Sequence, residues 1–503
     1  MSSRYAGLLG AACLLLLLLT ARAGAADSDR QVVHVLNRLA FGPTLDDFNY
    51  VKTIGVERYI AEQLDPKAIE EPIELRFRLA QLPTLGLDAD ELRGLYGPLR
   101  PVAGIKPSLD EVRAQQARAR LVVREAAEAR ILKAVLSRRQ LQQVMVNFWF
   151  NHFNIFSGKG LDRVWIGNYE DQAIRPHALG RFRDLLLAVA EHPAMLVYLD
   201  NTQNAAPGSP GARGAASGLN ENFAREVMEL HTLGVNGGYT QDDVTTLARV
   251  LTGWRVNPPG SEKFPGVAAI FDGMRHDYSP KMFLGRRLAA GGRAQGEEAL
   301  DILAGSPATA HHIAYQLAQY FVADVPPPAL VDRLAARFLA TGGDIRQVLE
   351  TLFASPEFWD SAGQKYKTPY EYVISAVRAA GVPVNNPRPL IGWMSRFGMP
   401  LYGCETPDGY ANTQQAWLSP EAAIQRISFA VAFARGGVPV SAQPAGDADG
   451  AALLPHRPDP VDPARLEEMF GASLSGSTRA AVEAASPGLR AALILGSPDF
   501  MHR

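Results

Sequence analysis

The sequence predicts a mainly α fold, a multi-helix array or bundle with long loops and little or no sheet. Three observations support this prediction. Apolar residues recur at intervals of three and four along most of the chain, as they do on one face of a helix. Gly and Pro separate these segments at places typical of helix ends. Sustained alternation of apolar and polar residues is rare, and no Asn-Gly turn is flanked by two alternating runs.

The first 26 residues have the three-part layout of a secretory signal. Arg4 supplies an early positive charge, an apolar run follows over Ala6–Leu19, and small residues lead to Ala26. This run is too short to cross ~30 Å of hydrocarbon comfortably, so we expect cleavage and no transmembrane helix afterwards. Cleavage would leave 477 residues with a net charge of −4 and one cysteine, Cys404. We therefore expect an exported protein, periplasmic or extracellular, with no disulfide within the chain.

The predicted helices follow in order along the rest of the chain. Residues 29–66 predict three short helices, because Thr44 and Asp47 have the spacing of a capping box and Gly55 follows the second helix. Residues Arg113–Phe153 predict a long helical stretch, rich in Ala and Arg before it turns aromatic. Further helices are expected over Pro176–Leu199, Asn220–Leu233, Thr240–Leu251, Ala308–Val322, Ala329–Ala340, Ile345–Phe353 and Pro369–Ala380.

Two stretches have a loose composition and divide the chain. We expect residues 27–435 to form one helical domain. Within it, residues 205–218 form a loop rich in Gly, Ala, Ser and Pro, of a length that usually belongs to lids, binding loops or disordered links. Residues 436–463 are rich in Pro, Gly and Asp and predict a linker. Residues 464–503 are then a short helical tail of the same domain.

Charge and motif content exclude several classes of function. The chain has 50 basic and 52 acidic residues, so it has little long-range field for nucleic acid or an anionic membrane. We expect no nucleic-acid partner and regard a neutral, polysaccharide-like polymer as the natural ligand. The sequence has no P-loop, no dinucleotide fingerprint, no G-x-S-x-G elbow and no zinc-type Cys/His spacing. No nucleotide, flavin or metal site is therefore assigned, although a divalent cation stays open as a cofactor.

The segment Asn220–Val244 carries the sharpest candidate site. At helical spacing Asn222, Glu226 and Glu229 share one stripe at the margin of an apolar sector. Arg225 precedes Glu229 by four residues and can pair with it. His231 lies near the helix end, where the helix dipole favours its protonated form. Two carboxylates and an amide suit acid/base catalysis or cation binding, whereas the alternative is an Arg–Glu network that joins helices.

A second candidate is the segment "VMVNFWFNHFNIFSGKG". Asn147, Asn151 and Asn154 form an amide stripe, which is unusual inside a helix. Together with Trp149, these amides offer the polar groups and the aromatic face that orient a hydroxyl-rich ligand. His152 lies among aromatic residues, and both a site histidine and a satisfied core histidine fit that position.

A third candidate is the loop "FDGMRHDYSPKMFLG". His276 and Asp277 could form a base with its orienting carboxylate, or a pair of metal ligands, and Lys281 follows as a binding group. The alternative is a purely structural role in the loop. Trp254 is a further candidate for substrate binding.

Several long motifs resemble those of the bacterial domain-of-unknown-function 1800 family. They are "RLAFGPT", "WFNHF", "IRPHALGRFRDLLLAVAEHPAMLVYLDN", "NENFAREVMELHTLGVNGGYTQDDV", "LARVLTGW", "RHDYSPKMFLG", "GGDIRQVLETLFASPEFW", "KYKTPYEYVISAVRA" and "LGSPDFMHR". The resemblance covers nearly the whole mature chain in order. It implies an exported, mainly helical protein, often encoded beside a second uncharacterised family that resembles the alkaline-phosphatase/sulfatase fold. A protein of that second family is thus an expected partner. The resemblance implies no activity, so it assigns no catalytic residues.

Three classes of function fit these observations. The leading hypothesis is a hydrolase or lyase acting on a polysaccharide-like polymer. In it, one of Glu226 and Glu229 is the general acid, the other is a base or nucleophile, and His152 or His276 orients substrate. Helix residues three apart have Cβ atoms only about 5–6 Å apart, so the partner carboxylate could instead be Asp277.

The other two classes are a non-catalytic envelope scaffold, or binding protein for a partner enzyme, and a metalloprotein. The metalloprotein hypothesis draws on His152, His231, His276, Asp277, Glu226 and Glu229.

Overall fold

The computed structural model describes residues 27–99, 107–214, 216–258, 261, 266–442 and 459–503. These residues divide into two compact units. Unit 1 takes its residues from 1–68, 359–393 and 417–503, and unit 2 from 69–358 and 394–416. The predicted signal peptide, 1–26, lies outside the described residues, as does 443–458, most of the predicted linker.

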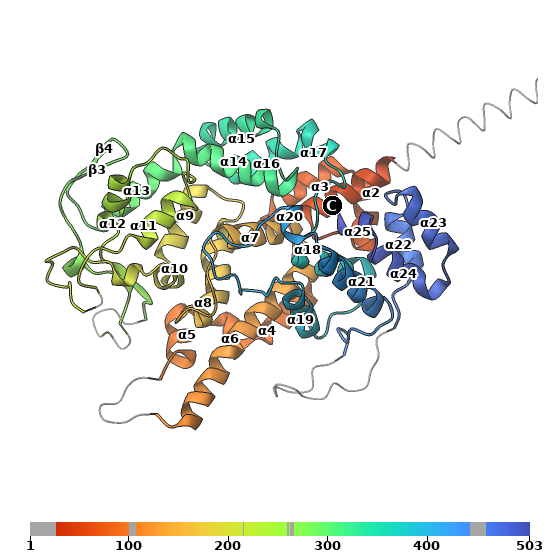
Figure 1. Cartoon of the computed structure of the whole chain (residues 1–503), viewed down its shortest axis with the longest axis horizontal. Helices are drawn as coiled ribbons and strands as arrows, with labels where there is room; N and C mark the ends of the chain where they lie inside the picture. Colours follow the sequence, from red (N-terminus) through yellow and green to blue (C-terminus); the bar gives the residue numbers. More distant parts are fainter. Residues whose placement is uncertain (1–26, 100–106, 215, 259–260, 262–265, 443–458) are drawn as a thin grey trace, which may run out of the picture. The chain divides into compact units, whose positions relative to one another are not determined.

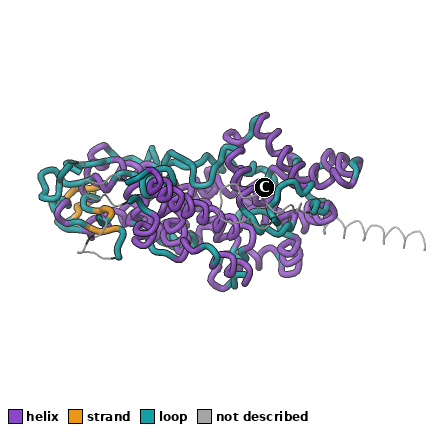
Figure 2. The backbone as a smooth tube through the Cα atoms, turned by 90° about the horizontal axis from the view of Figure 1, so that it is seen from below, coloured by secondary structure: helices purple, strands orange, loops and turns teal. Residues whose placement is uncertain are grey.

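The structure confirms the mainly α fold class. Figure 2 shows helices and loops along the tube, with strands only in short stretches. These strands form two antiparallel ribbons in the described part of unit 2: β1 (Trp254–Val256) pairs with β2 (Ala269–Phe271), and β3 (Lys281–Phe283) pairs with β4 (Arg286–Leu288). Strands of three residues are too short to show the alternation that predicts a strand.

Unit 1 is built from the two ends of the chain and one central segment. A helix over residues 27–39 comes first. The other elements labelled in Figure 1 are α2 (Leu45–Ile54), α3 (Val56–Gln63), α18 (Pro369–Ala380), α21 (Pro420–Ala434), α22 (Pro463–Phe470), α23 (Gly476–Ala484), α24 (Pro487–Leu495) and α25 (Pro498–Met501). The helix α18 is buried along its whole length and forms the core of the unit. Three helices run across a boundary between the units: α17 (Pro356–Asp360), α19 (Arg388–Arg396) and α20 (Gln414–Trp417).

Unit 2 contains the remaining α-helices and the two ribbons. Its α-helices are α4 (Ile73–Ala80), α5 (Ala89–Tyr96), α6 (Leu109–Leu136), α7 (Gln140–His152), α8 (Asp162–Asn168), α9 (Phe182–Glu191), α10 (Pro193–Tyr198), α11 (Asn222–Glu229), α12 (Gln241–Val250), α13 (Arg293–Ala304), α14 (Pro307–Phe321), α15 (Pro328–Ala340) and α16 (Ile345–Phe353). A single π-helical turn over Tyr169–Ile174, labelled η3, follows α8. The helices α14, α15 and α16 pack as neighbours (Figure 1).

Two predicted helical segments are divided in the structure. The stretch predicted over Arg113–Phe153 breaks between α6 and α7, where Ser137 is extended and its hydroxyl accepts from the Arg139 backbone N–H at 3.0 Å. The stretch predicted over Pro176–Leu199 breaks between α9 and α10, because Pro193 starts a new helix. The helices predicted over Ile345–Phe353 and Pro369–Ala380 are confirmed at both ends.

A buried ion network fixes the aromatic helix α7 and its neighbours in place. Arg130 and Arg175 both pair with the Glu170 carboxylate, at 3.1 and 2.9 Å. Arg175 and Lys133 also pair with Asp171, at 2.7 and 2.6 Å. Removal of one member would leave a buried charge without its partner, which typically costs about 3–5 kcal/mol. The network therefore makes the π-helical turn a rigid support for α7.

The described residues include no helix long and apolar enough to span a bilayer.

Candidate functional site

Helix α11 carries the acidic residues that the sequence singles out. Phe223 and Val227 are buried, while Glu226 and Glu229 lie at the margin of the core, as the helical spacing predicts. Asn222 is exposed at the start of the helix and does not extend the stripe into the core. Its backbone N–H donates to the Asn220 side chain at 3.0 Å.

The predicted pair between Arg225 and Glu229 is confirmed, with a nitrogen–oxygen distance of 3.5 Å. The same guanidinium also reaches Glu221 at 3.2 Å and the Gln241 side chain at 2.9 Å. Glu221 accepts in addition from Thr245 at 2.9 Å. Because Gln241 and Thr245 belong to α12, this network joins α11 to α12. The side chain of Arg225 is about a third exposed, so each ion pair adds little stability.

Glu226 is a predicted acid whose proton affinity is changed by its surroundings. Burial raises the pKa of the Glu226 carboxyl, and the negative charges of Glu229 and Asp408 raise it further. Burial and the neighbouring Glu229 carboxylate raise the pKa of Tyr239 to about 12. Burial also raises the pKa of Tyr198, whose hydroxyl lies within reach of the charge on Glu226. We refer to Glu226, Glu229, Asp408, Tyr198 and Tyr239 as the Glu226 cluster.

Asp408 enters the cluster from a loop that the sequence reasoning missed. Asn151 holds this loop through both main-chain polar groups of one residue: its amide N–H2 donates to the Tyr410 carbonyl at 2.9 Å, and its amide oxygen accepts from the Tyr410 N–H at 2.8 Å. Asn154 donates to the Cys404 and Thr406 carbonyls at 3.0 and 2.8 Å. Two members of the predicted amide stripe thus fasten the loop that carries Asp408.

The close approach of this loop to α7 requires a glycine. Gly409 has a φ of +71°, and a Cβ atom built there would lie 2.3 Å from the Asn151 carbonyl oxygen. The run Thr406–Tyr410, "TPDGY", contains Pro, Asp and Gly in the order typical of a tight turn. That local signal could have identified the turn, but not its contact with α7.

Two buried histidines, His152 and His231, and the half-buried His312 lie close together near the end of α11. The ring of His152 lies 6.0 Å from that of His231 and 6.4 Å from that of His312, between ring centroids. His152 bonds to the His231 carbonyl at 3.1 Å and His312 to the Leu230 carbonyl at 3.3 Å. Burial lowers the pKa of all three, for His231 to about 3. The protonated form predicted for His231 is therefore wrong, because burial outweighs the helix dipole.

A fully buried carboxyl group, that of Asp162, also acts on Tyr198. Asp162 begins α8, is 0% exposed, and has no hydrogen-bond partner at either side-chain oxygen. Burial raises the pKa of Asp162 to about 9, against the lowering effect of Lys159. The charge of Asp162 also acts on the Tyr198 hydroxyl, as that of Glu226 does. No motif in the sequence marks Asp162, since a lone Asp at a helix start is an ordinary helix signal.

The third predicted group forms a separate network around α12 and the two ribbons. Asp277 pairs with Arg249 at 2.7 Å and accepts from the Ser279 hydroxyl at 2.6 Å. Burial alone would raise the pKa of Asp277, but these bonds and the charge of Lys281 hold it well below its usual range. The imidazole of His276 lies between the Thr252 and Gly291 carbonyls, at 2.7 and 2.9 Å.

The ammonium of Lys281 donates to Gln295 at 2.7 Å and to the Ser279 carbonyl at 2.9 Å. Its further bond runs to the Asp277 carbonyl. These bonds of His276, Asp277 and Lys281 join residues within the segment 249–295, whereas the Glu226 cluster is drawn from other parts of the chain. The two predicted groups are thus held by separate networks.

The remaining predicted binding residues are buried. Trp149 is 0% exposed and donates to the Ala178 carbonyl at 2.9 Å. Asn147 accepts from Arg130 at 2.8 Å. Trp254 lies in β1 with its ring against Gly296, where a Cβ atom would come within 2.6 Å of the ring. These side chains support the packing around the site.

The Gly- and Pro-rich loop over 205–218 is closed at its base. The Ala205 N–H donates to the Gly218 carbonyl at 3.0 Å. The backbone N–H groups of Ala206 and Gly211 donate to the carbonyls of Arg275 and Met274, each at 2.8 Å. The loop is therefore fastened to the segment before His276, in the same unit as α11.

The structure gives no support for a metal centre. In the described ranges, no three His, Cys, Asp or Glu side chains are arranged to hold a metal ion. Among the three neighbouring histidines, for example, the rings of His152 and His312 are already hydrogen-bonded to main-chain carbonyls.

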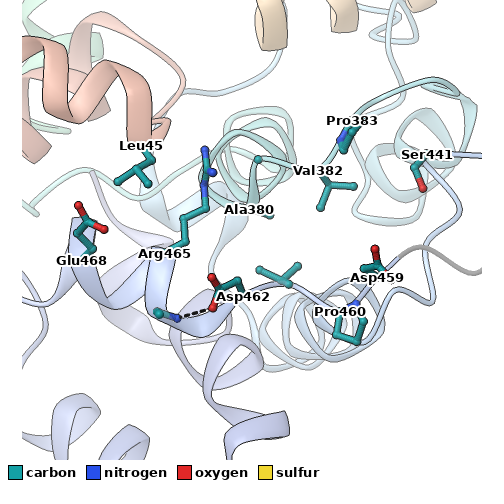
Figure 3. A pocket seen from close by; sticks show the side chains of 13 residues that line it. Leu45, Ala380, Val382, Pro383, Ser441, Asp459, Pro460, Asp462, Arg465 and Glu468 are labelled. Atoms are coloured by element: carbon teal, nitrogen blue, oxygen red, sulfur yellow. Dashed lines mark hydrogen bonds between the residues drawn. The ribbon is translucent and has the colours of Figure 1, made fainter.

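Two cavities lie in unit 1, and none of the residues predicted for the site lines either of them. One has a volume of about 480 Å³ and is shown in Figure 3. Arg465 extends to the end of α18, next to Gly381, and the carboxylates Asp459, Asp462 and Glu468 line the same cavity (Figure 3). The second has a volume of about 430 Å³ and is lined mainly by the first helix and α25, with Phe470 of α22 in its wall.

Comparison with known proteins identifies one family. The model of the family described as "Protein of unknown function (DUF1800)" matches residues 34–502. No curated protein and no solved structure matches the sequence.

Proposed function

Since the chain belongs to the DUF1800 family, whose function is unknown, we propose its activity from the chemistry of its own residues: an exported hydrolase or lyase that acts on a polysaccharide-like polymer by carboxylate acid/base catalysis. Glu226 is the general acid. Glu229 or Asp408 is the second carboxylate, which acts as base or nucleophile. A periplasmic or extracellular address, expected from the N-terminal sequence, would put the protein where such polymers occur.

The observation that carries the proposal is the raised pKa of Glu226 beside two other carboxylates. An acid catalyst must hold its proton near neutral pH, while its partner must be ionised. Burial, together with the charges of Glu229 and Asp408, favours the protonated form of Glu226. Glu229 pairs with Arg225 at 3.5 Å. Different surroundings thus separate the roles of neighbouring acids.

The reaction would follow from these two roles. In hydrolysis, Glu226 donates its proton to the oxygen of the leaving sugar as the glycosidic bond breaks, and the second carboxylate takes a proton from the attacking water. In a lyase, the second carboxylate would remove a carbon-bound proton, and Glu226 would again protonate the leaving oxygen. Tyr198 and Tyr239 supply hydroxyl groups beside these acids, which suits orientation of a hydroxyl-rich ligand.

The test is turnover of a panel of neutral and acidic polysaccharides by the purified mature protein. Glu226→Gln keeps the shape of the side chain and removes its proton transfer, so we expect at least about a hundredfold loss of kcat with an unchanged melting temperature. Glu229→Gln should also lower kcat. Glu350→Gln, an exposed glutamate on α16, is the matched control and should keep full activity. An inert wild type, or equal activity in Glu226→Gln, would refute the proposal.

A second candidate is a non-catalytic envelope scaffold that binds a partner enzyme. The network of Arg225 with Glu221, Gln241 and Thr245 favours it, because these residues join α11 to α12 and need no substrate. Under this proposal, Arg225→Met lowers the melting temperature, and no polysaccharide is turned over by the wild type. The partner of the neighbouring sulfatase-like family would then be captured by surface residues, with Glu226→Gln binding it as well as wild type does.

A further inference from the structure

The cavity of about 480 Å³ in unit 1 is lined by charges of both signs (Figure 3). Its charged groups are the guanidinium of Arg465 and the carboxylates of Asp459, Asp462 and Glu468. Three negative charges and one positive charge give this wall a net charge of −2. Apart from Ser441, the other lining residues, from α2, the end of α18 and the start of α22, are glycine or apolar. The volume is that of a small-molecule site.

Arg465 is held in place by packing and not by a counter-charge. Its side chain extends toward Ala380 at the end of α18 (Figure 3). The guanidinium lies against Gly381, which has a φ of +65°, and a Cβ atom there would lie 2.5 Å from Cζ of Arg465. The negative end of the α18 dipole favours a cation at this place.

The guanidinium of Arg465 is open to a ligand. Among the described residues it has no hydrogen-bond or ion-pair partner. Of its three nitrogens only Nε is both buried and unpartnered, so the two terminal nitrogens are accessible. An acid group in the cavity can therefore bind Arg465 without displacing an existing partner.

The three carboxylates of the same wall are exposed. In the part of the chain that the structure describes, Asp459 and Glu468 make neither a hydrogen bond nor an ion pair. Asp462 caps α22 with one oxygen, which accepts from the Ala464 N–H at 3.0 Å, and its second oxygen stays available. The cavity thus offers acceptors for ammonium groups as well as a donor for an acid group.

This combination of charges selects against simple ions. An amine without an acid group would leave Arg465 without a partner. An acid without an amine would meet three carboxylates, which repel it. A dipolar ligand with more positive than negative groups fits the net charge of the wall and can engage both kinds of group.

We propose that this cavity binds a basic amino acid, free or at the carboxyl end of a peptide, with its carboxylate on Arg465, its ammonium groups on the carboxylates of the wall and its aliphatic chain against Val382 and Val461. An arginine can donate two parallel hydrogen bonds to a carboxylate, and an ammonium has three N–H donors for carboxylate oxygens. The site belongs to unit 1 and does not depend on the function proposed for unit 2.

The test is calorimetry of the mature protein with lysine, norleucine, cadaverine and Nα-acetyl-lysine at constant ionic strength. Norleucine lacks the side-chain ammonium of lysine, and cadaverine lacks its carboxylate. We expect lysine to bind at least about tenfold more tightly than either. The tighter binder of lysine and Nα-acetyl-lysine distinguishes a free amino acid from the end of a peptide.

Two variants separate the two kinds of contact. Arg465→Gln should weaken lysine binding about tenfold without weakening cadaverine binding, because only lysine has a carboxylate. The double variant Asp459→Asn/Glu468→Gln should weaken the binding of both; Asp462 is kept because it caps α22. Arg30→Gln, in the wall of the second cavity, is the matched control and should bind lysine as wild type does. Melting temperatures without ligand check that each variant is folded.

Four results would overturn the proposal. They are no binding of lysine or Nα-acetyl-lysine, equal affinity for lysine and norleucine, equal affinity for lysine and cadaverine, and lysine binding that neither Arg465→Gln nor the double variant weakens. Because turnover of polysaccharide is not measured, an inert Glu226 cluster would leave this test unchanged.

Discussion

The buried carboxyl of Asp162 predicts an unusual dependence of stability on pH. Both of its oxygens lack partners, and burial raises its pKa to about 9. In the unfolded chain an aspartate has a pKa of about 3.9. Between these two values the folded protein holds a proton that the unfolded chain releases. Stability due to this group is therefore complete below about pH 4 and is lost as the pH rises toward 9.

The size of the effect follows from the same two values. Each pKa unit corresponds to about 1.4 kcal/mol, so keeping Asp162 protonated at pH 7 costs about 4 kcal/mol of folding free energy. Asn has nearly the same shape and cannot ionise. We expect Asp162→Asn to be more stable than wild type by up to about 4 kcal/mol at pH 7, with a gain that shrinks to near zero at pH 4.

Urea denaturation at pH 4, 5.5, 7 and 8.5 measures this difference. The diagnostic quantity is its slope, about 1.4 kcal/mol per pH unit. Asp332→Asn, the same substitution at an exposed position of α15, is the matched control and should follow wild type at every pH. A difference between Asp162→Asn and wild type that does not change with pH would refute the reasoning, because it would show that Asp162 has an ordinary pKa in the folded protein.

Three further predictions concern the same unit. Burial lowers the pKa of His231 to about 3, so the free energy of unfolding decreases as the pH drops from about 6.5 toward 3. In acid denaturation, His231→Phe should reduce the slope of this decrease by about 1.4 kcal/mol per pH unit. Gly409→Ala should lower the free energy of unfolding in urea by about 2 kcal/mol or more, because the new Cβ would meet the Asn151 carbonyl. Gly208 has a similar φ of +73° but no atom near the position of a Cβ, so Gly208→Ala should cost only about 1 kcal/mol. Equal costs for the two variants would contradict the contact between Gly409 and Asn151. If Glu226 is the general acid, turnover should fall as the pH rises past a value above the ordinary range of a glutamate, and a pH–rate profile with no such alkaline limb would count against that role.

Local patterns were sufficient for most of the helices. The capping box of Thr240 and Asp243 is present, with the Asp243 carboxylate accepting from the Thr240 N–H at 2.9 Å. Helix breaks were harder to predict. The break at Ser137 depends on the Glu71 carboxylate, which accepts from the Ser137 hydroxyl at 2.7 Å. A residue 66 positions away cannot be recognised as a partner from helical periodicity.

The candidate site was harder still to predict, because some of its contacts join residues that are far apart in the sequence. Helical spacing predicted the stripe of Glu226 and Glu229 and the pair with Arg225, because these are contacts within one helix. Asp408 follows Glu229 by well over a hundred residues and approaches Glu226 only because Asn151 holds its loop. Asn151 and Asn154, two amides of the predicted ligand-binding stripe, hold this loop in place. Their chemistry was recognisable from the sequence, but their partner was not.

The partners of each carboxyl decide which acids in unit 2 can hold a proton. Burial alone would raise the pKa of Asp171, but Lys133 and Arg175 lower it to about 2. Asp277 is held ionised in the same way by Ser279 and Arg249, which lower its pKa. Such carboxylates are structural counter-charges, and they carry no proton to donate at neutral pH.

Glu226 and Asp162 differ from Asp171 and Asp277 in the groups that surround their carboxyl oxygens. Glu226 lies beside two carboxylates, and Asp162 has no partner at either oxygen. Burial then raises the pKa of both groups, which suits them to donate a proton. Glu226 is half-buried at the margin of the core, whereas Asp162 is fully enclosed. Solvent can therefore reach Glu226, which favours proton donation there and not at Asp162.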